Sequence, residues 1–368
     1  MRTATITIHP AAITHNLNQV KQRAPNAKVL AMVKANAYGH GVKAVLPALQ
    51  QADGLGVATF SEALEARQLG WDKIIGLIEG VFCADEWQQA IDYDCSCVIH
   101  HAPQLQWALD NIPKVDSPTR QVWLKYNTGM NRLGFDDNTI VPVAEQLHAA
   151  GYQLILTTHF ANANDRDHPL NTVQIQRFSS MLKILQETVY SDIKGSLCNS
   201  AGIVNFTDYH YDWVRPGIML YGSSPVNYKC ATDLDLQPAM DFSAQIIALQ
   251  TLNVGDAIGY GSRWTAPKET RIALISIGYG DGYPRLFNEG AYVCLIDEAS
   301  EQSFICPIRG QVAMDMIVID VSDVPTDIAL NSKVILWGTM PHVDEVAAHA
   351  GTIGYELLCR LSARPKRI

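Results

Sequence analysis

The stretch Leu30-Ala-Met-Val-Lys34-Ala-Asn-Ala-Tyr38-Gly-His-Gly41 joins an apolar run to a loop of small residues. The run before Lys34 is typical of a buried strand, and Lys34 stands where that strand ends. A lysine that is desolvated at such a position can lose its charge and become a nucleophilic amine. Lysine is seldom buried, so a solvated strand end is the ordinary interpretation of this pattern. Which of the two holds for Lys34 depends on the residues that the rest of the chain places beside it.

Strands and helices alternate on both sides of this stretch, after a first helix that Pro10 opens. We expect eight short strands at 29–33, 54–60, 73–79, 96–100, 121–126, 154–159, 195–198 and 213–215. We expect intervening helices at 42–52, 61–70, 84–93, 102–111, 139–150 and 170–190, with Ser61 as an N-cap. This alternation predicts a parallel sheet, and eight repeats predict an N-terminal (β/α)8 TIM-type barrel within an α/β fold. A doubly wound open sheet is the alternative, but no Gly-x-Gly-x-x-Gly follows the first strand.

The pattern changes near residue 235, where helical periodicity disappears. Strands are expected at 242–249, 271–277, 292–296, 316–321 and 334–337, followed by helices at 343–350 and 355–361. The sequence therefore predicts two domains, a barrel over 1–234 that carries Lys34 and a mainly β domain over 235–368. A further strand is expected at 2–8, before the barrel, and it could pack against the second domain.

Composition narrows the class of protein. The chain has 368 residues and a net charge of −9 without a basic patch, which argues against nucleic acid or an anionic membrane as partner. No apolar run has the length of a signal peptide or a membrane span, so we expect a cytoplasmic protein. The eight cysteines are scattered without a metal-binding spacing, which indicates reduced thiols and no metal.

The carboxyl ends of barrel strands carry the active site in this architecture. The residues expected there form a polar ring of mixed charge: Lys34, Glu79, His100, Lys125, His159, Ser200 and Arg215. In Trp213-Val-Arg-Pro-Gly-Ile218, the proline can begin a helical turn whose Gly217 and Ile218 amides would bind an anion such as phosphate. A tight structural turn explains the same residues equally well.

With Val33-Lys-Ala-Asn-Ala-Tyr-Gly-His-Gly41, the chain resembles the bacterial alanine racemases at their pyridoxal-phosphate lysine motif. The resemblance covers essentially the whole chain, because eight further motifs follow in the family's order. They are Thr128-Gly-Met-Asn-Arg-Leu-Gly134, Thr158-His-Phe160, Asn199-Ser-Ala201, Arg215-Pro-Gly-Ile218, Ile258-Gly-Tyr-Gly261, Gly278-Tyr-Gly-Asp-Gly-Tyr-Pro284, Val312-Ala-Met-Asp-Met316 and Tyr355-Glu-Leu357.

The resemblance implies the cofactor pyridoxal 5'-phosphate and a role for each matching residue. The catalytic bases would be Lys34, which is also the Schiff-base lysine, and Tyr260. The phosphate would be held by Tyr38, Ser200, the Gly217 and Ile218 amides, and Tyr355. The cofactor ring would contact Arg215 at the pyridine nitrogen, Arg132 at the phenolic oxygen, and His159. Substrate contacts would come from Arg132, Met314, Asp315 and Tyr279, and Lys125 matches a lysine that is often carbamylated.

The same resemblance implies a head-to-tail homodimer that racemises L- and D-alanine, with Tyr260 supplied by the partner chain. The D-alanine would serve peptidoglycan synthesis, or the enzyme would serve alanine catabolism. Two other classes of protein share the cofactor: a non-enzymatic barrel that lacks the β domain, and a decarboxylase with a site cysteine in it. Two stretches depart from the family pattern. Asn127 stands where an aspartate is usual, which leaves the charge balance around Lys125 and Arg132 open, and Cys198-Asn199 precedes Ser200 in a region that varies within the family.

Overall fold

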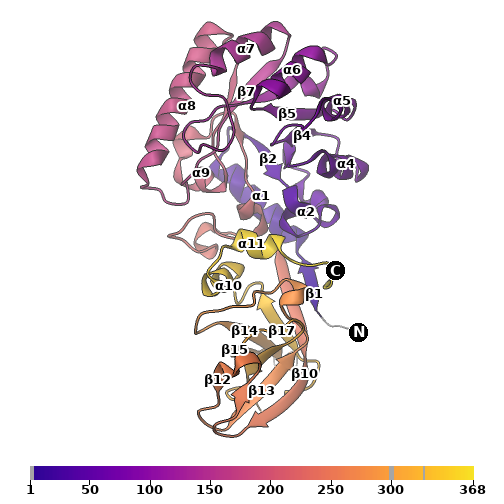
Figure 1. The fold of residues 1–368 in the computed structure, drawn as a ribbon, viewed down its shortest axis with the longest axis vertical. Coiled ribbons are helices and arrows are strands. Elements are labelled where there is room, and N and C mark those ends of the chain that lie inside the picture. The colour runs from indigo at the N-terminus through magenta and orange to yellow at the C-terminus, as the bar shows by residue number, and fades with distance from the viewer. Residues whose placement is uncertain (1–3, 298–301, 326–327) are drawn as a thin grey trace. The chain divides into compact units, whose positions relative to one another are not determined.

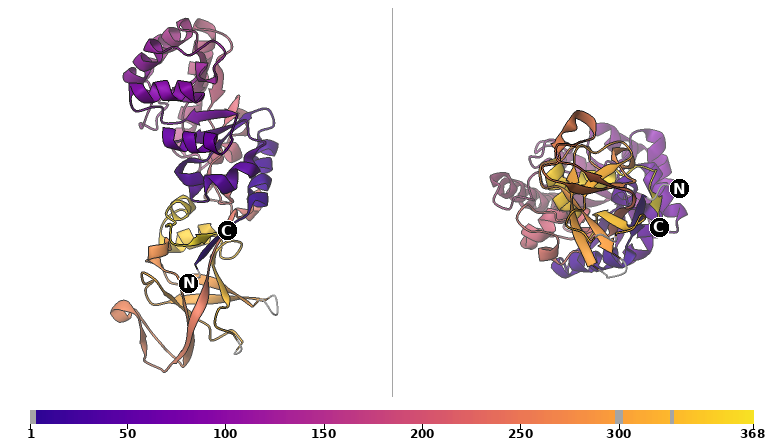
Figure 2. Two further views of the ribbon diagram at one scale, coloured as in Figure 1. Left: turned by 90° about the vertical axis from the view of Figure 1, so that its right-hand side faces the viewer. Right: turned by 90° about the horizontal axis from the view of Figure 1, so that it is seen from below.

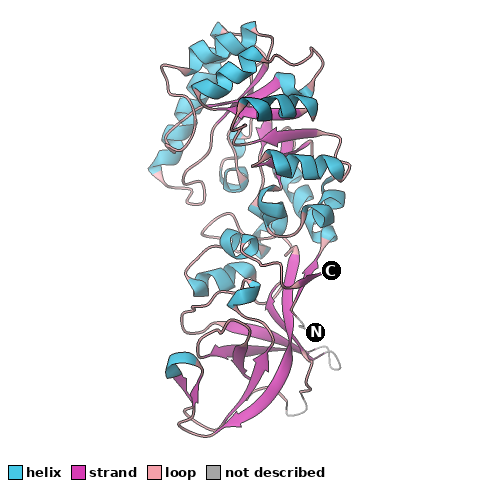
Figure 3. Ribbon diagram, turned by 45° about the vertical axis from the view of Figure 1, so that its right-hand side comes forward, coloured by secondary structure: helices cyan, strands magenta, loops and turns pink. Residues whose placement is uncertain are grey.

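The computed structural model describes residues 4–297, 302–325 and 328–368. The chain divides into two compact units. One unit comprises Ile13–Leu236, and the other combines the segment that ends at Ala12 with Gln237–Ile368. Helices dominate the first unit and strands dominate the second (Figure 3).

The first unit is built on eight parallel strands in the order β8-β7-β6-β5-β4-β3-β2-β9. They are β2 (Lys28–Met32), β3 (Gly54–Val57), β4 (Ile74–Leu77), β5 (Cys95–Ile99), β6 (Gln121–Lys125), β7 (Gln153–Thr157), β8 (Lys194–Ser196) and β9 (Trp213–Val214). The sheet closes between its end strands, where the Arg215 N–H donates to the Cys198 carbonyl at 2.9 Å. The predicted (β/α)8 barrel is therefore confirmed.

Helices follow the strands and lie around the outside of this sheet (Figure 1). Their bounds are α1 (Pro10–Arg23), α2 (Lys34–Tyr38), α3 (Val42–Val45), α4 (Phe60–Gln68), α5 (Ala84–Asp92), α6 (Ala102–Asp110), α7 (Ile140–Ala149), α8 (Pro169–Thr188) and α9 (Ser200–Asn205). The helix expected over 42–52 is shorter, since α3 gives way to a 3-10 turn at Leu46–Leu49. Pro47 explains the change, because proline lacks the N–H that an α-helix needs there.

The N-cap predicted at Ser61 is wrong. Helix α4 begins two residues earlier, and its N-cap is Thr59, whose hydroxyl accepts from the Glu62 N–H. Glu62 occupies the third helical position, and its carboxylate accepts from the Thr59 N–H, which completes a capping box. Ser61 has no acidic residue at the corresponding position, since Leu64 stands there.

The interior of the barrel is filled by a few large side chains against glycine. Leu30 is fully buried, and a Cβ added at Gly54 or Gly76 would lie within 3.0 or 3.2 Å of its methyl groups. A Cβ at Gly56 would lie 2.5 Å from the Met32 sulfur. These glycines leave room for the side chains of β2, so the strand that leads to Lys34 is packed on its inner face.

The second unit contains a mainly antiparallel sheet in the order β13-β16-β15-β14-β17-β10-β1-β18, with a further β13–β10 pairing. Its strands are β1 (Thr5–Ile8), β10 (Met240–Leu252), β13 (Thr270–Ile275), β14 (Tyr292–Asp297), β15 (Gln302–Arg309), β16 (Ile317–Asp320), β17 (Lys333–Trp337) and β18 (Lys366–Arg367). A small hairpin of β11 (Ala257–Ile258) and β12 (Trp264–Thr265) and two helices, α10 (Val343–Ala350) and α11 (Gly354–Cys359), complete this unit.

Strand β10 is the longest element of this sheet (Figures 1 and 2). It pairs with β1 and β17 over its first half and with β13 over its second half. The sequence did not predict β15, because Pro307 interrupts the run and proline argues against a central strand. Among the described residues, no helix has the length and apolarity that crossing a membrane requires.

Candidate active site

Lys34 follows β2 at the carboxyl end of the barrel, where hydrogen bonds on both sides hold the backbone. The Met32 N–H donates to the Pro216 carbonyl at 2.9 Å, and the Val33 N–H donates to the Gly56 carbonyl at 2.9 Å. Lys34 itself is half-buried. The backbone from which its side chain extends is thus fixed between strand β3 and the loop after β9.

The residues that follow Lys34 form a left-handed turn. Ala35, Asn36, Ala37 and Tyr38 have φ angles of 52°, 54°, 53° and 51° in succession. Left-handed backbone costs an L-residue about 1–2 kcal/mol, and four such residues in a row are unusual outside glycine-rich loops. Their conformation therefore depends on contacts with the surrounding structure.

Several of these contacts come from the same loop. The Ala37 N–H donates to the Val33 carbonyl at 2.7 Å, and the Gly41 N–H donates to the Asn36 carbonyl at 2.9 Å. The Asn36 side chain accepts from the Val42 N–H at 3.1 Å. The loop is thereby closed on itself, and Asn36 holds its C-terminal end through both its backbone carbonyl and its side chain.

An aromatic pair packs beneath the turn. The Tyr38 ring stacks on Tyr221 with ring centroids 4.9 Å apart, and His40 lies on Tyr221 at 4.6 Å. The Tyr221 hydroxyl donates to the Met32 carbonyl at 2.9 Å. This packing directs the Tyr38 side chain and ties it to the end of β2.

The Tyr38 hydroxyl comes close to the Gly217 backbone, where a Cβ would lie 2.4 Å from it. The Gly217 N–H donates to the Ser200 hydroxyl at 2.8 Å. Tyr38, Ser200 and Gly217 therefore gather at the ends of β2, β8 and β9. The Gly217 amide is paired rather than free, and Ile218 begins a 3-10 turn, Ile218–Tyr221.

The Arg215 guanidinium is buried among neutral acceptors. Its Nη1 donates to the Ser196 carbonyl at 2.9 Å and also to the Ser196 hydroxyl. Its Nη2 donates to the Leu197 carbonyl at 3.2 Å and also to the Thr158 carbonyl. Burial lowers the pKa of Arg215 to about 10, so it stays a cation at neutral pH although the acceptors of these hydrogen bonds are neutral oxygens.

Lys125, the last residue of β6, lies within a cluster of positive charge. Burial lowers its pKa well below the ordinary value of 10.5, and the charges of Arg215, Arg132 and Lys34 lower it further. His159 is half-buried, and desolvation together with the charges of Lys125 and the same basic groups lowers its pKa well below 6.5. The site thus gathers Lys34, Lys125, Arg132, His159 and Arg215, a concentration of basic groups that favours an anion.

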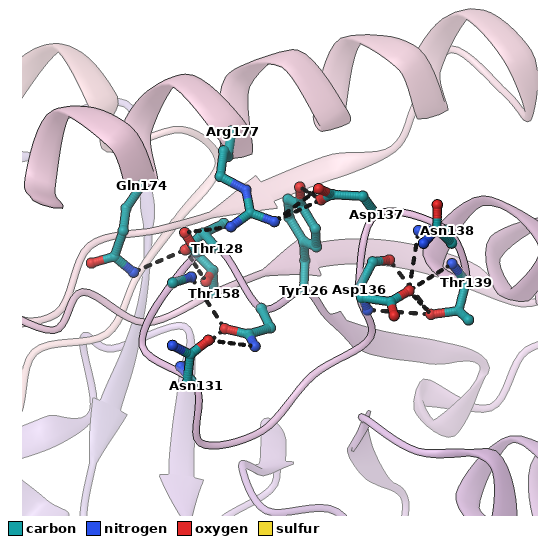
Figure 4. A network of polar contacts seen from close by, with 12 residues as sticks. Tyr126, Thr128, Asn131, Asp136, Asp137, Asn138, Thr139, Thr158, Gln174 and Arg177 are labelled. Atoms are coloured by element: carbon teal, nitrogen blue, oxygen red, sulfur yellow. Dashed lines mark hydrogen bonds and ion pairs between the residues drawn. The ribbon is translucent and has the colours of Figure 1, made fainter.

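Arg132 lies on the loop between β6 and α7, and helix α8 holds this loop from outside (Figure 4). Gln174 is fully buried, and its Nε2 donates to the Thr128 hydroxyl and to the His159 carbonyl, both at 2.9 Å. Its Oε1 accepts from the Ala161 N–H at 2.9 Å. One side chain therefore connects the loops that follow β6 and β7.

A second contact from α8 lies one turn further along. The Arg177 guanidinium forms a bidentate pair with Asp137 at 2.8 and 2.9 Å, and the Tyr126 hydroxyl donates to the same carboxylate (Figure 4). The Thr128 and Thr158 hydroxyls lie 2.8 Å apart, and the Thr158 carbonyl accepts from the Arg215 guanidinium. The network thus extends from the surface of α8 to Arg215.

Asn127 organises the start of this loop. Its Oδ1 accepts from the Gly129 N–H at 3.1 Å and the Asn131 N–H at 3.0 Å, and its Nδ2 donates to the Asn131 side chain at 3.1 Å. An aspartate could make the first two contacts but not the third. The side chain therefore acts on the local backbone of the loop, and the positive cluster gains no negative charge from it.

The remaining candidate residues lie in the β unit. Tyr260, Met314 and Tyr279 are exposed, with 74%, 52% and 38% of their surface accessible. Asp315 pairs with Arg364 at 2.6 Å, and Arg364 also lies 3.5 Å from the buried carboxylate of Asp281. Tyr355 lies in the first turn of α11.

Glu62 accepts from the backbone of Ala35, next to Lys34, and Gln174 donates to the His159 carbonyl, and the sequence analysis did not single them out. Glu62 carries a detectable signal, since Thr59-x-x-Glu62 is a capping-box pattern. Gln174 is a polar residue on the buried stripe of α8, beside Ile175 and Phe178, which is a second signal. Within residues 4–297, 302–325 and 328–368, no cluster of three or more His, Cys, Asp or Glu side chains suits a metal ion.

Comparison with known proteins matches both units to one family. The alanine racemase N-terminal domain model matches residues 8–225, and the alanine racemase C-terminal domain model matches residues 239–368. An alanine racemase of Psychrobacter is 54% identical, with 100% of this chain and 99% of the relative covered. The solved alanine racemase of Acinetobacter baumannii superposes with a TM-score of 0.92 at 48% identity, covering 100% of this chain and 99% of the other. The alanine racemase of Bartonella henselae, solved with covalently bound pyridoxal phosphate, has a TM-score of 0.85 at 28% identity, with 100% and 99% covered.

Proposed function

The chain belongs to the alanine racemase family, and we propose that it interconverts L- and D-alanine with pyridoxal 5'-phosphate held at Lys34. The observation that carries this proposal is that Lys34, Arg132 and Arg215 lie close enough to Lys125, at the carboxyl end of the barrel, for their charges to lower its pKa. An isolated solvated lysine would not have these neighbours.

The residues of the barrel unit suit an anionic cofactor. Tyr38, Ser200 and Gly217 provide hydroxyl and backbone groups at the ends of three strands, and the space at Gly217 exists because glycine has no Cβ. The net positive charge of the cluster favours a phosphate and a phenolic oxygen. We propose that these residues, the Ile218 amide and Tyr355 hold the phosphate, and that Arg215, Arg132 and His159 contact the ring.

When bound, pyridoxal phosphate supplies an electron sink for the negative charge that forms when the α-proton leaves. Inversion of a stereocentre needs one proton carrier on each face of the substrate. Lys34 is the proposed carrier on one face. Tyr260 is the proposed carrier on the other, and its exposure leaves it accessible to a second chain.

We propose a homodimer in which each site is completed by the partner's β unit. Support comes from the exposed apolar residues of that unit, Met314 and Tyr279 among them, which a monomer would leave in water. In this arrangement Met314 and Asp315 line the substrate pocket and Tyr279 narrows its entrance. The ion pair with Arg364 supports the role proposed for Asp315, because it holds the segment that carries Met314 and Asp315.

Lys125 is the proposed site of a carbamate. A neutral buried amine is a nucleophile, and its attack on CO₂ forms an N–C bond and releases one proton, which leaves a carboxylate on the lysine. The surrounding Arg132, Arg215 and Lys34 favour that negative charge. Asn127 leaves the positive cluster without a carboxylate of its own, so the carbamate would restore the charge balance.

The β unit over residues 237–368 separates this proposal from a non-enzymatic cofactor-binding barrel, which lacks such a unit. In the β unit Cys294 and Cys306 are buried, so neither suits the exposed site cysteine of a decarboxylase. We propose a cytoplasmic enzyme whose D-alanine serves peptidoglycan synthesis or whose activity serves alanine catabolism.

The test is to incubate the purified protein with L-alanine and measure D-alanine. Wild type should produce it, whereas Lys34→Ala and Tyr260→Phe should each lose at least about 100-fold in rate, the usual size of a proton-transfer contribution. Borohydride should fix the cofactor to Lys34. Full activity of Tyr260→Phe in both directions, or fixation at another residue, would contradict the assignment.

A further inference from the structure

The carboxylate of Glu62, in the first turn of α4, accepts three backbone hydrogen bonds. The Ala35 N–H donates to Oε1 at 2.7 Å, and the Ala58 and Thr59 N–H groups donate to Oε2 at 2.8 and 3.3 Å. The first donor belongs to the loop after β2 and the other two to the loop after β3. One carboxylate therefore joins two neighbouring loops at the rim of the barrel.

Capping of α4 accounts for only part of this arrangement. The capping box needs the Thr59 N–H and the return bond from the Glu62 N–H to the Thr59 hydroxyl, at 3.4 Å. The contact with Ala35, which is 27 residues away, adds nothing to the helix. It is also the shortest of the three bonds, and a charged acceptor makes it stronger than a neutral one.

Ala35 is the residue after Lys34 and the first residue of the left-handed turn. On the other side of Lys34, the Val33 N–H is held by the Gly56 carbonyl at 2.9 Å. The Lys34 backbone thus lies between two anchored amides, and Glu62 provides one of the anchors. Without it, the turn would lose a contact that opposes its backbone strain.

We propose that Glu62 is a positioning residue, which holds the Lys34 backbone so that the amine reaches the cofactor carbonyl. This inference rests on the proposed role of Lys34. It predicts that the Ala35 contact affects cofactor attachment, and that the capping contacts of the same side chain affect only stability.

Two substitutions separate these effects. In Glu62→Gln, the side-chain NH₂ faces the backbone N–H groups of one of the two loops. The side chain therefore no longer accepts from both loops, although it keeps its size and shape. Thr59→Val removes the capping hydroxyl and leaves the Glu62–Ala35 bond in place. Glu65→Gln, on an exposed side chain of the same helix, is the matched control. Each variant is studied below its melting temperature, by titrating the apoprotein with pyridoxal phosphate and by counting borohydride fixation at Lys34.

Glu62→Gln should bind the cofactor about tenfold more weakly and fix less of it, the size expected for one hydrogen bond to a charged group. Thr59→Val should lower the melting temperature but keep the wild-type cofactor affinity, and Glu65→Gln should change neither. Equal weakening in Thr59→Val and Glu62→Gln, or unchanged binding in Glu62→Gln, would overturn the inference. Failure of wild type to fix cofactor at Lys34 would instead contradict the proposed function.

Discussion

At the scale of single residues, the barrel site depends on burying positive groups with few opposing charges. Lys125 is the clearest example, because it is buried beside Arg132, Arg215 and Lys34. Burying it costs free energy whenever the amine is protonated in the unfolded chain and neutral in the folded chain. Such a cost is usual for groups whose pKa serves a function.

Lys125→Met should therefore change how stability depends on pH in CO₂-free buffer. Between the lowered folded pKa and the ordinary value of 10.5, the unfolded wild type binds one more proton than the folded form, so its stability rises with pH. The slope from this group is about 1.4 kcal/mol per pH unit, and the variant lacks it. Urea unfolding at pH 7, 8 and 9 measures both proteins. Added bicarbonate should stabilise wild type and not Lys125→Met, and parallel pH profiles would contradict the assignment.

Arg215 is held by carbonyl oxygens, so its substitution should reveal how far the fold depends on a cation there. Arg215→Glu would place a carboxylate against the Ser196, Thr158 and Leu197 carbonyls. We expect the free energy of unfolding to fall by roughly 3–5 kcal/mol, the usual cost of an uncompensated buried charge. Urea unfolding measures the loss. Arg263→Glu, at an exposed arginine of the β unit, is the control and should change stability by less than about 0.5 kcal/mol.

At the scale of elements, helix α8 supports two loops of the site that are far apart in sequence. Gln174 reaches the loops after β6 and β7, and Arg177 reaches Asp137 on the first of them (Figure 4). The Arg177 pair is partly exposed, so it contributes little by itself. The buried amide of Gln174 is therefore the main contact.

Gln174→Met keeps the side-chain size and removes all three hydrogen bonds. The Thr128 hydroxyl, the His159 carbonyl and the Ala161 N–H would each lose this partner, so the free energy of unfolding should fall by about 3 kcal/mol or more. Lys183→Gln on the exposed face of the same helix should stay within about 0.5 kcal/mol. Thermal unfolding of both variants tests the difference, and equal stability would exclude a supporting role for Gln174.

At the scale of the whole molecule, Lys34 lies in the barrel unit and Tyr260 in the β unit. A site shared between two chains can be tested with hybrid dimers. A Lys34→Ala chain paired with a Tyr260→Phe chain has one site with both intact residues, so tandem-tagged hybrids should recover about half of the wild-type activity, although each parent is inactive.

The matched control pairs wild type with the Lys34→Ala/Tyr260→Phe double variant. If sites are shared, each site of this hybrid lacks one of the two residues and activity is absent. If each chain carried a complete site, the control would keep half of the activity and the first hybrid none. The two hybrids therefore give opposite results under the two arrangements.

Much of the architecture follows from the sequence, because the local spacing of apolar residues indicates which segments are buried. Most of the barrel strands are apolar runs followed by a small or polar loop, although β8 is Lys194-Gly-Ser196, and the strand bounds differ from the prediction by a few residues. The exceptions have local causes: Pro47 shortens a helix, Pro307 conceals a strand, and Glu62 moves the N-cap to Thr59. The strand-end residues Lys34, Lys125, Ser200 and Arg215 could be named in advance for the same reason.

The sequence by itself determined which residues end the barrel strands, since each strand end follows from the position of its apolar run along the chain. Only the tertiary structure decided their chemical state. Burial and the charges of Arg215, Arg132 and Lys34 lower the pKa of Lys125, and Arg215 and Lys34 come from the ends of other strands. The left-handed turn after Lys34 is held by Glu62 from a separate loop. Both effects arise from contacts between distant segments, and no local pattern encodes the distance between them.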